Sequence, residues 1–308
     1  MLRCGQVGLV GRPNVGKSTL LNCLIGAKIS ITSRKPQTTR HRLLGVLTRS
    51  DCQYVFVDTP GSCRSGLKRL STAMASALRA TIADVDVVVL VVDATNWTDL
   101  DESLLGQLGS STPVVVAVNK IDVLKKKYYD FSLLELEKKI GSVINPASFC
   151  LVSARKNKGT DVLLSTIASL LPQQDFFYPE DMITDRTDRF LVSEIIREKV
   201  FRCLGDELPY GSAVYIESFE ECPGITKIRA VIYVEKENYK RIIIGKNGDL
   251  IKTIGIVARQ DIERFLGCKV FLGLWVKVKV GWCDDTSCLQ ELGYETTEPD
   301  EQCPKKSS

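Results

Sequence analysis

The 308-residue chain has room for about two domains, and its composition, 44% hydrophobic and 25% charged, is ordinary for a soluble globular protein. The formal net charge of +4 is too small to indicate a nucleic-acid partner by itself, so any RNA-binding surface must come from local clustering of basic residues. Eleven cysteines without a CxxC pair indicate reduced thiols rather than a zinc site, and the longest apolar run, Val87–Val92, is too short to span a membrane.

Short β-branched runs alternate with helical stretches in the first half of the chain. This alternation predicts βαβ crossovers and a mainly parallel sheet covered on both faces, with ligands at the carboxyl ends of the strands. We therefore expect an α/β domain over residues 1–172, closed by Pro172. The predicted strands are Val7–Val10, Gln53–Val57, Val85–Val92, Val114–Val118 and Phe149–Val152, and helices such as Ser18–Ile25 and Leu133–Ile140 lie between most of them.

The segment Gly11–Ser18 follows the first predicted strand and matches the phosphate-loop pattern G-x-x-x-x-G-K-[ST]. Its glycines allow the backbone to curl so that successive N–H groups face the phosphates, and the following helix adds its positive N-terminus. We expect Lys17 to reach the β- and γ-phosphates and the Ser18 hydroxyl to bind Mg²⁺. The nucleotide-binding residues predicted here are Gly11, Arg12, Pro13, Asn14, Val15, Gly16, Lys17, Ser18 and Thr19.

Residues 33–40 show neither helical nor strand periodicity, as expected of a mobile switch. One threonine of this segment, Thr38 or Thr39, is expected to join the Mg²⁺ shell when GTP is bound. The alternative is a threonine that only caps a strand. His41, the single histidine, is interpreted as a solvated or packed neighbour rather than a catalytic base.

The run Asp58, Thr59, Pro60 and Gly61 ends another predicted strand. Asp58 is expected to hold Mg²⁺ through water, and the Gly61 N–H to sense the γ-phosphate. Ser62 follows where Ras-like proteins have glutamine, so no side chain is evidently placed to orient the attacking water. We therefore expect slow intrinsic hydrolysis.

The tetrapeptide Asn119, Lys120, Ile121 and Asp122 follows the strand Val114–Val118 and predicts guanine as the base. A carboxylate accepts both the ring N–H and the exocyclic amine of guanine, and adenine offers no such donor pair. Ser153 and Ala154 after the next strand complete the expected base loop, and the neighbouring Arg155 either covers the guanine or points to solvent.

A second unit with a different rhythm begins after the polar linker 173–187 and is expected over residues 188–294, followed by a disordered polar tail, 295–308. It is predicted to fold as an α+β domain in the order helix, strand, strand, helix, turn, helix, strand, which is the order of a type II KH domain. The predicted elements are a helix over Arg189–Leu204, strands over Ser212–Glu220 and Ile225–Glu235, a short helix, a turn over Gly245–Gly248, a helix to Phe265 and a strand over Lys269–Val280.

The turn Gly245, Lys246, Asn247 and Gly248 matches the G-x-x-G loop with which KH domains approach a nucleic-acid backbone. Lys240 and Lys252 flank it, so the predicted RNA-binding residues are basic on both sides of the turn. An ordinary glycine pair between two helices is the alternative for the turn alone. Lys277 and Lys279 on the last strand either extend the basic surface or form a solvated face.

The chain resembles the Era family of bacterial GTPases, and the similarity runs from Val7 to about Tyr294. It includes two long specific stretches, Ile29–Arg42 and Leu274–Trp282. The resemblance implies Mg²⁺-dependent GTP hydrolysis, binding near the 3′ end of small-subunit ribosomal RNA, and a role in assembling the 30S-type subunit. It further implies loose association with the inner face of the cytoplasmic membrane, and we expect the protein to be a cytoplasmic monomer.

The family pattern also favours Thr39 over Thr38 as a Mg²⁺ ligand and suggests that Asn14 holds a K⁺ ion near the transferring phosphate. The residues expected to act in hydrolysis are therefore Lys17, Thr39 and Asn14, and the expected metal ligands are Ser18, Thr39 and Asp58. Asn14 as a simple turn-former remains the alternative. For the whole chain, the alternative function is an RNA-binding module whose nucleotide site is structural and barely hydrolytic.

Overall fold

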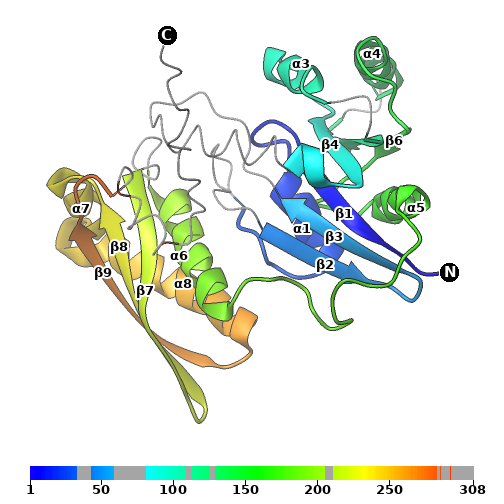
Figure 1. Ribbon diagram of the computed structural model, residues 1–308. Helices are drawn as coiled ribbons and strands as arrows, with labels where there is room; N and C mark the ends of the chain where they lie inside the picture. Colours follow the sequence, from blue (N-terminus) through cyan, green and yellow to red (C-terminus); the bar gives the residue numbers. More distant parts are fainter. Residues whose placement is uncertain are drawn as a thin grey trace, which may run out of the picture.

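The structure is a computed structural model that describes residues 1–32, 43–58, 81–108, 112–124, 129–204 and 211–282, together with Asp285 and Leu292. Two β-sheets, each with its own helices, lie side by side (Figure 1). Among the described residues, none of the helices combines the length and the apolar character that crossing a membrane requires.

The first sheet has six strands in the order β2-β3-β1-β4-β5-β6. All neighbouring strands are parallel except β2 and β3, which are antiparallel. The strands are β1 (Arg3–Val10), β2 (Leu43–Thr48), β3 (Cys52–Asp58), β4 (Val87–Asp93), β5 (Val114–Asn119) and β6 (Ser148–Leu151). The mainly parallel sheet expected from the alternating sequence is therefore confirmed.

Helices cover both faces of this sheet: α1 (Lys17–Ile25), α3 (Asp99–Leu105), α4 (Tyr129–Gly141) and α5 (Thr160–Leu170). Strand β4 shows that both faces of the sheet carry apolar side chains. Val87, Val89 and Val91 pack in the core under α1 and α5, whereas Val88, Leu90 and Val92 pack in the core under α3 and α4. Each fully buried side chain of this kind stabilises the fold by about 1.5–3 kcal/mol relative to exposure.

Strand β2 was not expected from the sequence, because Gly45 interrupts its apolar run at the centre. The glycine lies close to neighbouring apolar side chains. A Cβ at Gly45 would lie 2.8 Å from the Ile29 side chain and 2.9 Å from that of Leu21. The edge strand therefore sits close to helix α1 and the loop that follows it.

The segment between the two sheets lies along the edge of the first one. The Gln53 side chain of β3 accepts hydrogen bonds from the N–H groups of Phe177 and Tyr178 at 2.9 and 3.0 Å and donates to the Tyr178 carbonyl at 2.8 Å. Further along, the Thr184 hydroxyl donates to the Leu44 carbonyl of β2 at 2.8 Å. The stretch expected to be a linker is thus fixed at several points.

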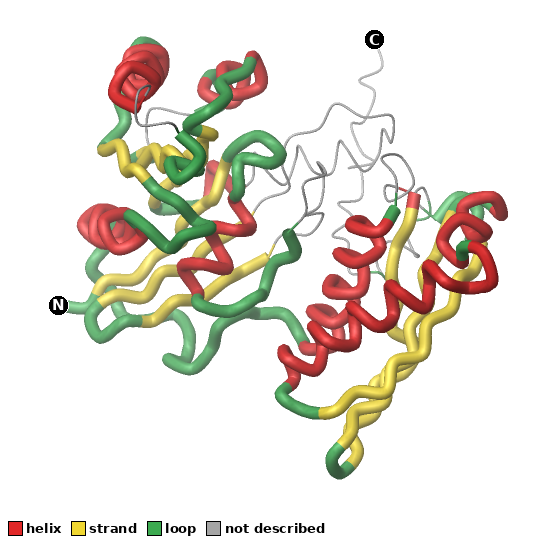
Figure 2. Tube along the Cα trace, turned by 180° about the vertical axis from the view of Figure 1, so that it is seen from behind, coloured by secondary structure: helices red, strands yellow, loops and turns green. Residues whose placement is uncertain are grey.

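The second sheet has the order β7-β8-β9, with β7 and β8 antiparallel and β8 and β9 parallel. Its helices share one core with the strands on one face of the sheet (Figure 2). The elements are α6 (Asp188–Cys203), β7 (Ser212–Cys222), β8 (Ile225–Val234), α7 (Glu237–Ile244), a short 3₁₀ turn (Lys246–Gly248), α8 (Asp249–Leu266) and β9 (Lys269–Val278). This is the predicted order of a type II KH domain.

Polar contacts join the two units where α6 and α8 meet the loop after α1. The Thr32 hydroxyl donates to Glu198 of α6 at 3.3 Å, and Lys28 forms an ion pair with Asp261 of α8 at 3.2 Å. Lys199 also pairs with Asp261, and these two ammonium groups, acting against burial of the carboxyl, hold the Asp261 pKa below its ordinary value. The contact is therefore ionic at its centre.

Candidate functional site

The loop between β1 and α1, which is the expected phosphate loop, forms a curled turn. The Lys17 ammonium donates to the carbonyls of Gly11 and Arg12 at 2.7 and 3.1 Å, so its side chain folds back over the turn. A Cβ at Gly11 would lie 2.4 Å from the Val91 carbonyl, which explains why only glycine fits there. Asn14 has a left-handed φ of 67°, a conformation that asparagine tolerates.

The Arg12 side chain points away from the phosphate turn and toward the start of α3. It donates to the Asp101 carboxylate at 2.9 Å and to the Asn96 carbonyl at 2.7 Å. Within the expected nucleotide site, Arg12 thus offers its backbone rather than its guanidinium.

Asp58 ends β3 beneath this turn and is completely buried. One carboxylate oxygen, Oδ2, accepts hydrogen bonds from the Ser18 and Ser30 hydroxyls, both at 3.0 Å. The other, Oδ1, has no hydrogen-bond partner in the described part of the chain. Burial raises the Asp58 pKa, and the Lys17 ammonium and the two hydroxyls oppose this shift. Ser30 lies in the family-specific stretch Ile29–Arg42 but was not predicted as a site residue, because it belongs to none of the general nucleotide-binding motifs.

The expected base-reading residues converge at the carboxyl ends of β5 and β6. Buried Asn119 donates to the Val15 carbonyl at 2.9 Å and accepts from the Ala154 N–H at 3.0 Å, so it ties the phosphate turn to the last base loop. Asp122 is exposed, and one of its oxygens accepts the Ser153 hydroxyl at 2.6 Å. The carboxylate is thereby oriented while the rest of it stays accessible.

Lys120 adopts a left-handed φ of 67°, and its ammonium lies 2.6 Å from the Asp93 carboxylate. Burial raises the Asp93 pKa, but hydrogen bonds from Lys120 and Thr95 outweigh it and the net direction is downward. A charged Asp93 thus holds the Lys120 stem along the edge of the base site.

Several predicted residues lie outside the described part of the chain. They are Thr39, Thr59, Pro60 and Gly61, together with Thr38, His41 and Ser62. Over the residues that are described, no three His, Cys, Asp or Glu side chains cluster as a protein-only metal site.

The second site is the turn between α7 and α8. Gly245, Asn247 and Gly248 have left-handed φ angles of 74°, 52° and 81°. A Cβ at Gly245 would lie 2.8 Å from that of Leu250, so the close turn requires glycine. The side chains of Lys246 and Asn247 are exposed at its tip.

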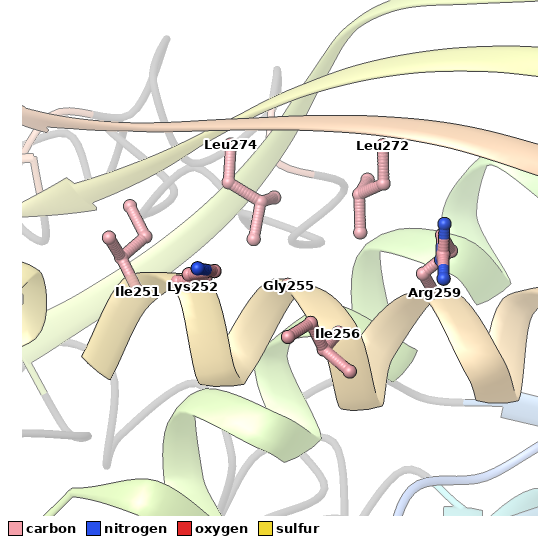
Figure 3. Close-up of a pocket in the computed structure, with 7 residues that line it drawn as sticks. All are labelled: Ile251, Lys252, Gly255, Ile256, Arg259, Leu272 and Leu274. Atoms are coloured by element: carbon pink, nitrogen blue, oxygen red, sulfur yellow. The ribbon is translucent and has the colours of Figure 1, made fainter. Parts of the chain in front are cut away.

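A cleft of about 350 Å³ opens beside this turn between α8 and β9 (Figure 3). Leu272 and Leu274 point from β9 toward the helix, and Gly255 leaves room between them (Figure 3). The lining residues are Ile251, Lys252, Gly255, Ile256, Arg259, Leu272 and Leu274. The cleft thus combines an apolar floor with two cations.

Of the other predicted RNA-binding residues, Lys252 lines the cleft and Lys240 lies 3.8 Å from the Glu237 carboxylate of its own helix. Gly255, Ile256 and Arg259 were missed. These residues repeat every four positions with Ile251 and Lys252 along one helix. Leucines alternate on the strand that lies opposite. Together, the two patterns are the sequence signal for such a cleft.

Comparisons with known proteins agree with this architecture. A family model described as 50S ribosome-binding GTPase matches residues 6–120, and a KH domain model matches residues 207–283. The chain is 49% identical over 293 residues to GTPase Era of Pseudomonas aeruginosa strain LESB58, covering 95% of each chain. GTPase Era of Pseudomonas fluorescens strain Pf0-1 is 47% identical, with 95% of this chain and 97% of the relative covered.

Two solved structures superpose with TM-scores of 0.89 at 38% identity, over 96% of this chain and 100% of the other. One is an Aquifex aeolicus Era variant bound to GDP and AlF4⁻, and the other is Era with MgGDPNP and nucleotides 1506–1542 of 16S ribosomal RNA. The chain is thus a P-loop GTPase joined to a KH domain. More particularly, it belongs to the family of GTPase Era, which confirms the resemblance and the fold class inferred from the sequence.

Proposed function

We propose that this GTPase is a nucleotide-driven switch that binds single-stranded RNA near the 3′ end of small-subunit ribosomal RNA and acts in assembly of that subunit. The observation that carries the proposal is that one chain holds both a phosphate turn with a buried Asp58 and a KH-type cleft beside Gly245–Gly248. The Era structure solved with a GTP analogue and ribosomal RNA supports the pairing of these two ligands.

The nucleotide would lie across the carboxyl edge of the first sheet. Lys17 would exchange the Gly11 and Arg12 carbonyls for the β- and γ-phosphates, because a phosphate is the stronger acceptor for an ammonium. Asp122, oriented by Ser153, would accept the two N–H groups of guanine. Asn119 would hold the phosphate turn and the base loop in register.

The residues around Asp58 suit Mg²⁺, which prefers hard oxygen ligands and keeps several waters. The unpartnered Oδ1 atom of Asp58 would bind a metal-bound water, and the Ser18 hydroxyl would bind the ion directly. Thr39 stays a predicted third ligand. The ion would neutralise charge on the phosphates, and this chain's own contribution is to fix the ligands before it binds.

Potassium is a second expected ion, with Asn14 as its ligand. The left-handed φ of Asn14 gives direct support to a role in the turn. The exposed side chain also leaves the amide oxygen accessible for an ion near the γ-phosphate. The two roles are compatible, because one is carried by the backbone and the other by the side chain.

RNA would lie with its backbone on the Gly245–Gly248 turn and its bases in the cleft. A G-x-x-G loop clamps about four nucleotides, and a cleft floored by leucines suits the flat faces of unpaired bases. Lys246 at the tip, with Lys252 and Arg259 along the cleft, would neutralise the phosphates. Lys277 is expected to contribute little here, because it pairs with Glu217 at 2.7 Å on the opposite face of the sheet.

The test separates the two sites. Replacing Lys246 and Asn247 by Asp keeps the turn, because aspartate also tolerates the left-handed φ of 52° at position 247. RNA affinity should fall by at least about tenfold, or roughly 1.4 kcal/mol, with unchanged intrinsic GTP hydrolysis. Normal RNA binding by the folded double variant would show that the RNA site lies elsewhere.

The alternative, an RNA-binding module with a structural nucleotide site, is motivated by Ser62 in the position of the water-orienting glutamine. Multiple-turnover GTP hydrolysis with and without ribosomal RNA distinguishes the two functions. Crosslinking to cellular RNA with GTP or GDP bound, followed by sequencing, would identify the RNA.

Three expectations remain predictions: a cytoplasmic location, a monomeric state and loose contact with the inner face of the cytoplasmic membrane. Cell fractionation, sedimentation at several protein concentrations and flotation with anionic vesicles test them.

A further inference from the structure

The second sheet has one face that no described helix covers. Helices α6, α7 and α8 share a single core with Ile228, Ala230 and Ile232 of β8, so they all lie on the same face of the sheet. Side chains alternate along a strand, so Lys227, Arg229 and Val231 face the other way. We call this other side the open face.

The open face carries large aromatic side chains in its centre and is well packed. Strand pairing places Val231 of β8 beside Trp275 of β9 and Tyr215 of β7. Val231 is completely buried although it lies outside the helical core. The centre of the open face is thus buried at this position of β8.

Two aromatic side chains of the open face, Phe271 and Trp275, are accessible to solvent. Phe271 is 57% exposed and Trp275 is 46% exposed, although both belong to a central stretch of strand β9. A Cβ at Gly273 would lie 2.7 Å from the Trp275 ring, so the indole extends over the glycine toward Phe271. The two residues are about 13 Å apart along the strand, at roughly 3.3 Å per residue.

Cations lie between and beside the rings. Lys227 pairs in register with Phe271, and Arg229 pairs with Gly273, the residue between the rings. Both side chains are exposed, and no described carboxylate lies within ion-pair distance of either. By contrast, Lys277 is already paired with Glu217, and Lys279 lies over the Tyr233 ring at 5.4 Å.

We propose that the open face is a second RNA-binding surface, on which unpaired bases stack on Phe271 and Trp275 while Lys227 and Arg229 contact the phosphates. Exposed aromatics interleaved with cations on a flat sheet are the combination that binds single strands, because every base has a face to stack and every nucleotide a phosphate. The proposal rests on the proposed function and extends it, because a KH cleft clamps about four nucleotides and a longer RNA needs further surface.

A lipid surface fits the same residues less well. Peripheral membrane proteins insert apolar side chains from helices or protruding segments into the headgroup boundary. Here the rings lie over the middle of a sheet, flanked by charged side chains at the same level. Stacking on a ligand that lies flat is the interaction this arrangement allows.

The test compares the full-length chain with a variant in which Phe271 and Trp275 are both Thr, a residue suited to strands. Phe177→Thr is the matched control, because Phe177 is 49% exposed and lies in the segment between the sheets. Two probes are needed: an oligonucleotide of about five nucleotides that fills only the cleft, and the ribosomal RNA fragment corresponding to nucleotides 1506–1542 of the solved complex.

We expect the double variant to bind the short probe like the wild type and the long probe at least tenfold more weakly, with the control unchanged. A second variant, Lys227→Glu with Arg229→Glu, should lower the slope of log affinity against log salt by about 1.4 for the long probe, since about 0.7 is lost per phosphate contact. This charge variant also keeps the proposal testable if the aromatic variant fails to fold.

Equal binding of the long probe by folded wild-type and variant chains would overturn the second surface while leaving the cleft intact. Loss of binding to anionic vesicles with unchanged RNA binding would assign the face to lipid instead. If the wild type binds neither probe, the proposed function itself fails.

Discussion

Arg202 of helix α6 donates hydrogen bonds to both oxygens of Thr32, at 3.1 Å to the carbonyl and 3.2 Å to the hydroxyl. Thr32 is the residue immediately before the segment 33–40 that is expected to respond to the γ-phosphate. The first helix of the KH domain is therefore hydrogen-bonded to the residue that precedes the expected switch segment. A nucleotide that moves this segment would act on α6 through a direct contact.

Replacing Arg202 by Ala should weaken the coupling between nucleotide and RNA. If GTP changes RNA affinity through this contact, the ratio of RNA affinities with GTP and GDP should move toward one, by about threefold or more. By linkage, RNA should also lose its effect on GTP affinity. RNA binding measured with each nucleotide tests this, and Arg49→Ala, which removes an exposed pair with Asp161, is the control. An unchanged ratio would show that coupling follows another path.

Asp122→Asn should exchange the base specificity. Hydrogen bonds to a charged acceptor are worth about 1.5–3 kcal/mol each, so GTP affinity should fall at least tenfold. Xanthosine triphosphate should gain, because its ring offers the opposite pattern. Ser153→Ala removes the 2.6 Å hydrogen bond that orients Asp122 and the bond that the same hydroxyl accepts from the Lys156 N–H at 3.2 Å, but it keeps the carboxylate, so it should weaken GTP binding less and keep the preference for guanine. Competition between GTP and xanthosine triphosphate for each variant measures the base preference. An undiminished preference for GTP in Asp122→Asn would contradict the role of Asp122 in reading the base.

In the metal-free protein, the ionised Asp58 carboxylate should lower the free energy of unfolding at neutral pH, compared with a neutral side chain at the same position. Burial raises its folded-state pKa above the ordinary value, so the unfolded chain loses this proton at a lower pH than the folded chain does. The free energy of unfolding therefore falls as pH rises from the unfolded pKa to the folded one, and the cost persists above it.

Without Mg²⁺ and nucleotide, Asp58→Asn should accordingly unfold at a higher denaturant concentration than the wild type near pH 7. The difference should vanish at a pH below the ordinary carboxyl range. With Mg²⁺ and GTP the order should reverse, because only the carboxylate supports metal binding. Urea unfolding at several pH values measures this, and a less stable metal-free variant at pH 7 would refute it.

Hydrolysis should be faster in potassium than in sodium at equal ionic strength. A fixed cation held by Asn14 would stabilise the charge that develops on the phosphates. Asn14→Gly should erase the difference while accommodating the left-handed φ of 67°, whereas Asn14→Ala adds strain at the same position. Equal wild-type rates in the two salts would leave Asn14 with a role in the turn alone.

The arrangement of the candidate nucleotide site could be predicted best where spacing alone determines geometry. Gly11–Ser18, Asn119 and Asp122 could be found because each follows a strand, and parallel strands bring their carboxyl ends together. Ser30 could not be found, because its contact with Asp58 depends on a loop held by the Asn22 side chain, which accepts the Ser30 N–H at 2.9 Å.

The candidate RNA site could be predicted only in part. The turn glycines are visible as a pattern, but the cleft needs β9 to lie against α8, and that pairing is long-range. Gly255 illustrates the limit: in the sequence it is a helix-weakening residue, and only the structure shows that it lines the cleft opposite Leu274. The direction of the Arg12 side chain was likewise hidden, because Asp101 is distant in sequence.

The attachment of residues 177–184 to the first sheet limits how far the KH domain can travel. Thr184 is fixed to β2 and α6 begins at Asp188, so the stretch between these two residues can span about 14 Å at most, at roughly 3.6 Å per residue. Loss of the Lys28 ion pairs and of the Arg202 hydrogen bonds to Thr32 would therefore still leave the KH domain held by this short connection. The two domains therefore stay at a high effective concentration for each other, so a contact between them that is broken would form again readily.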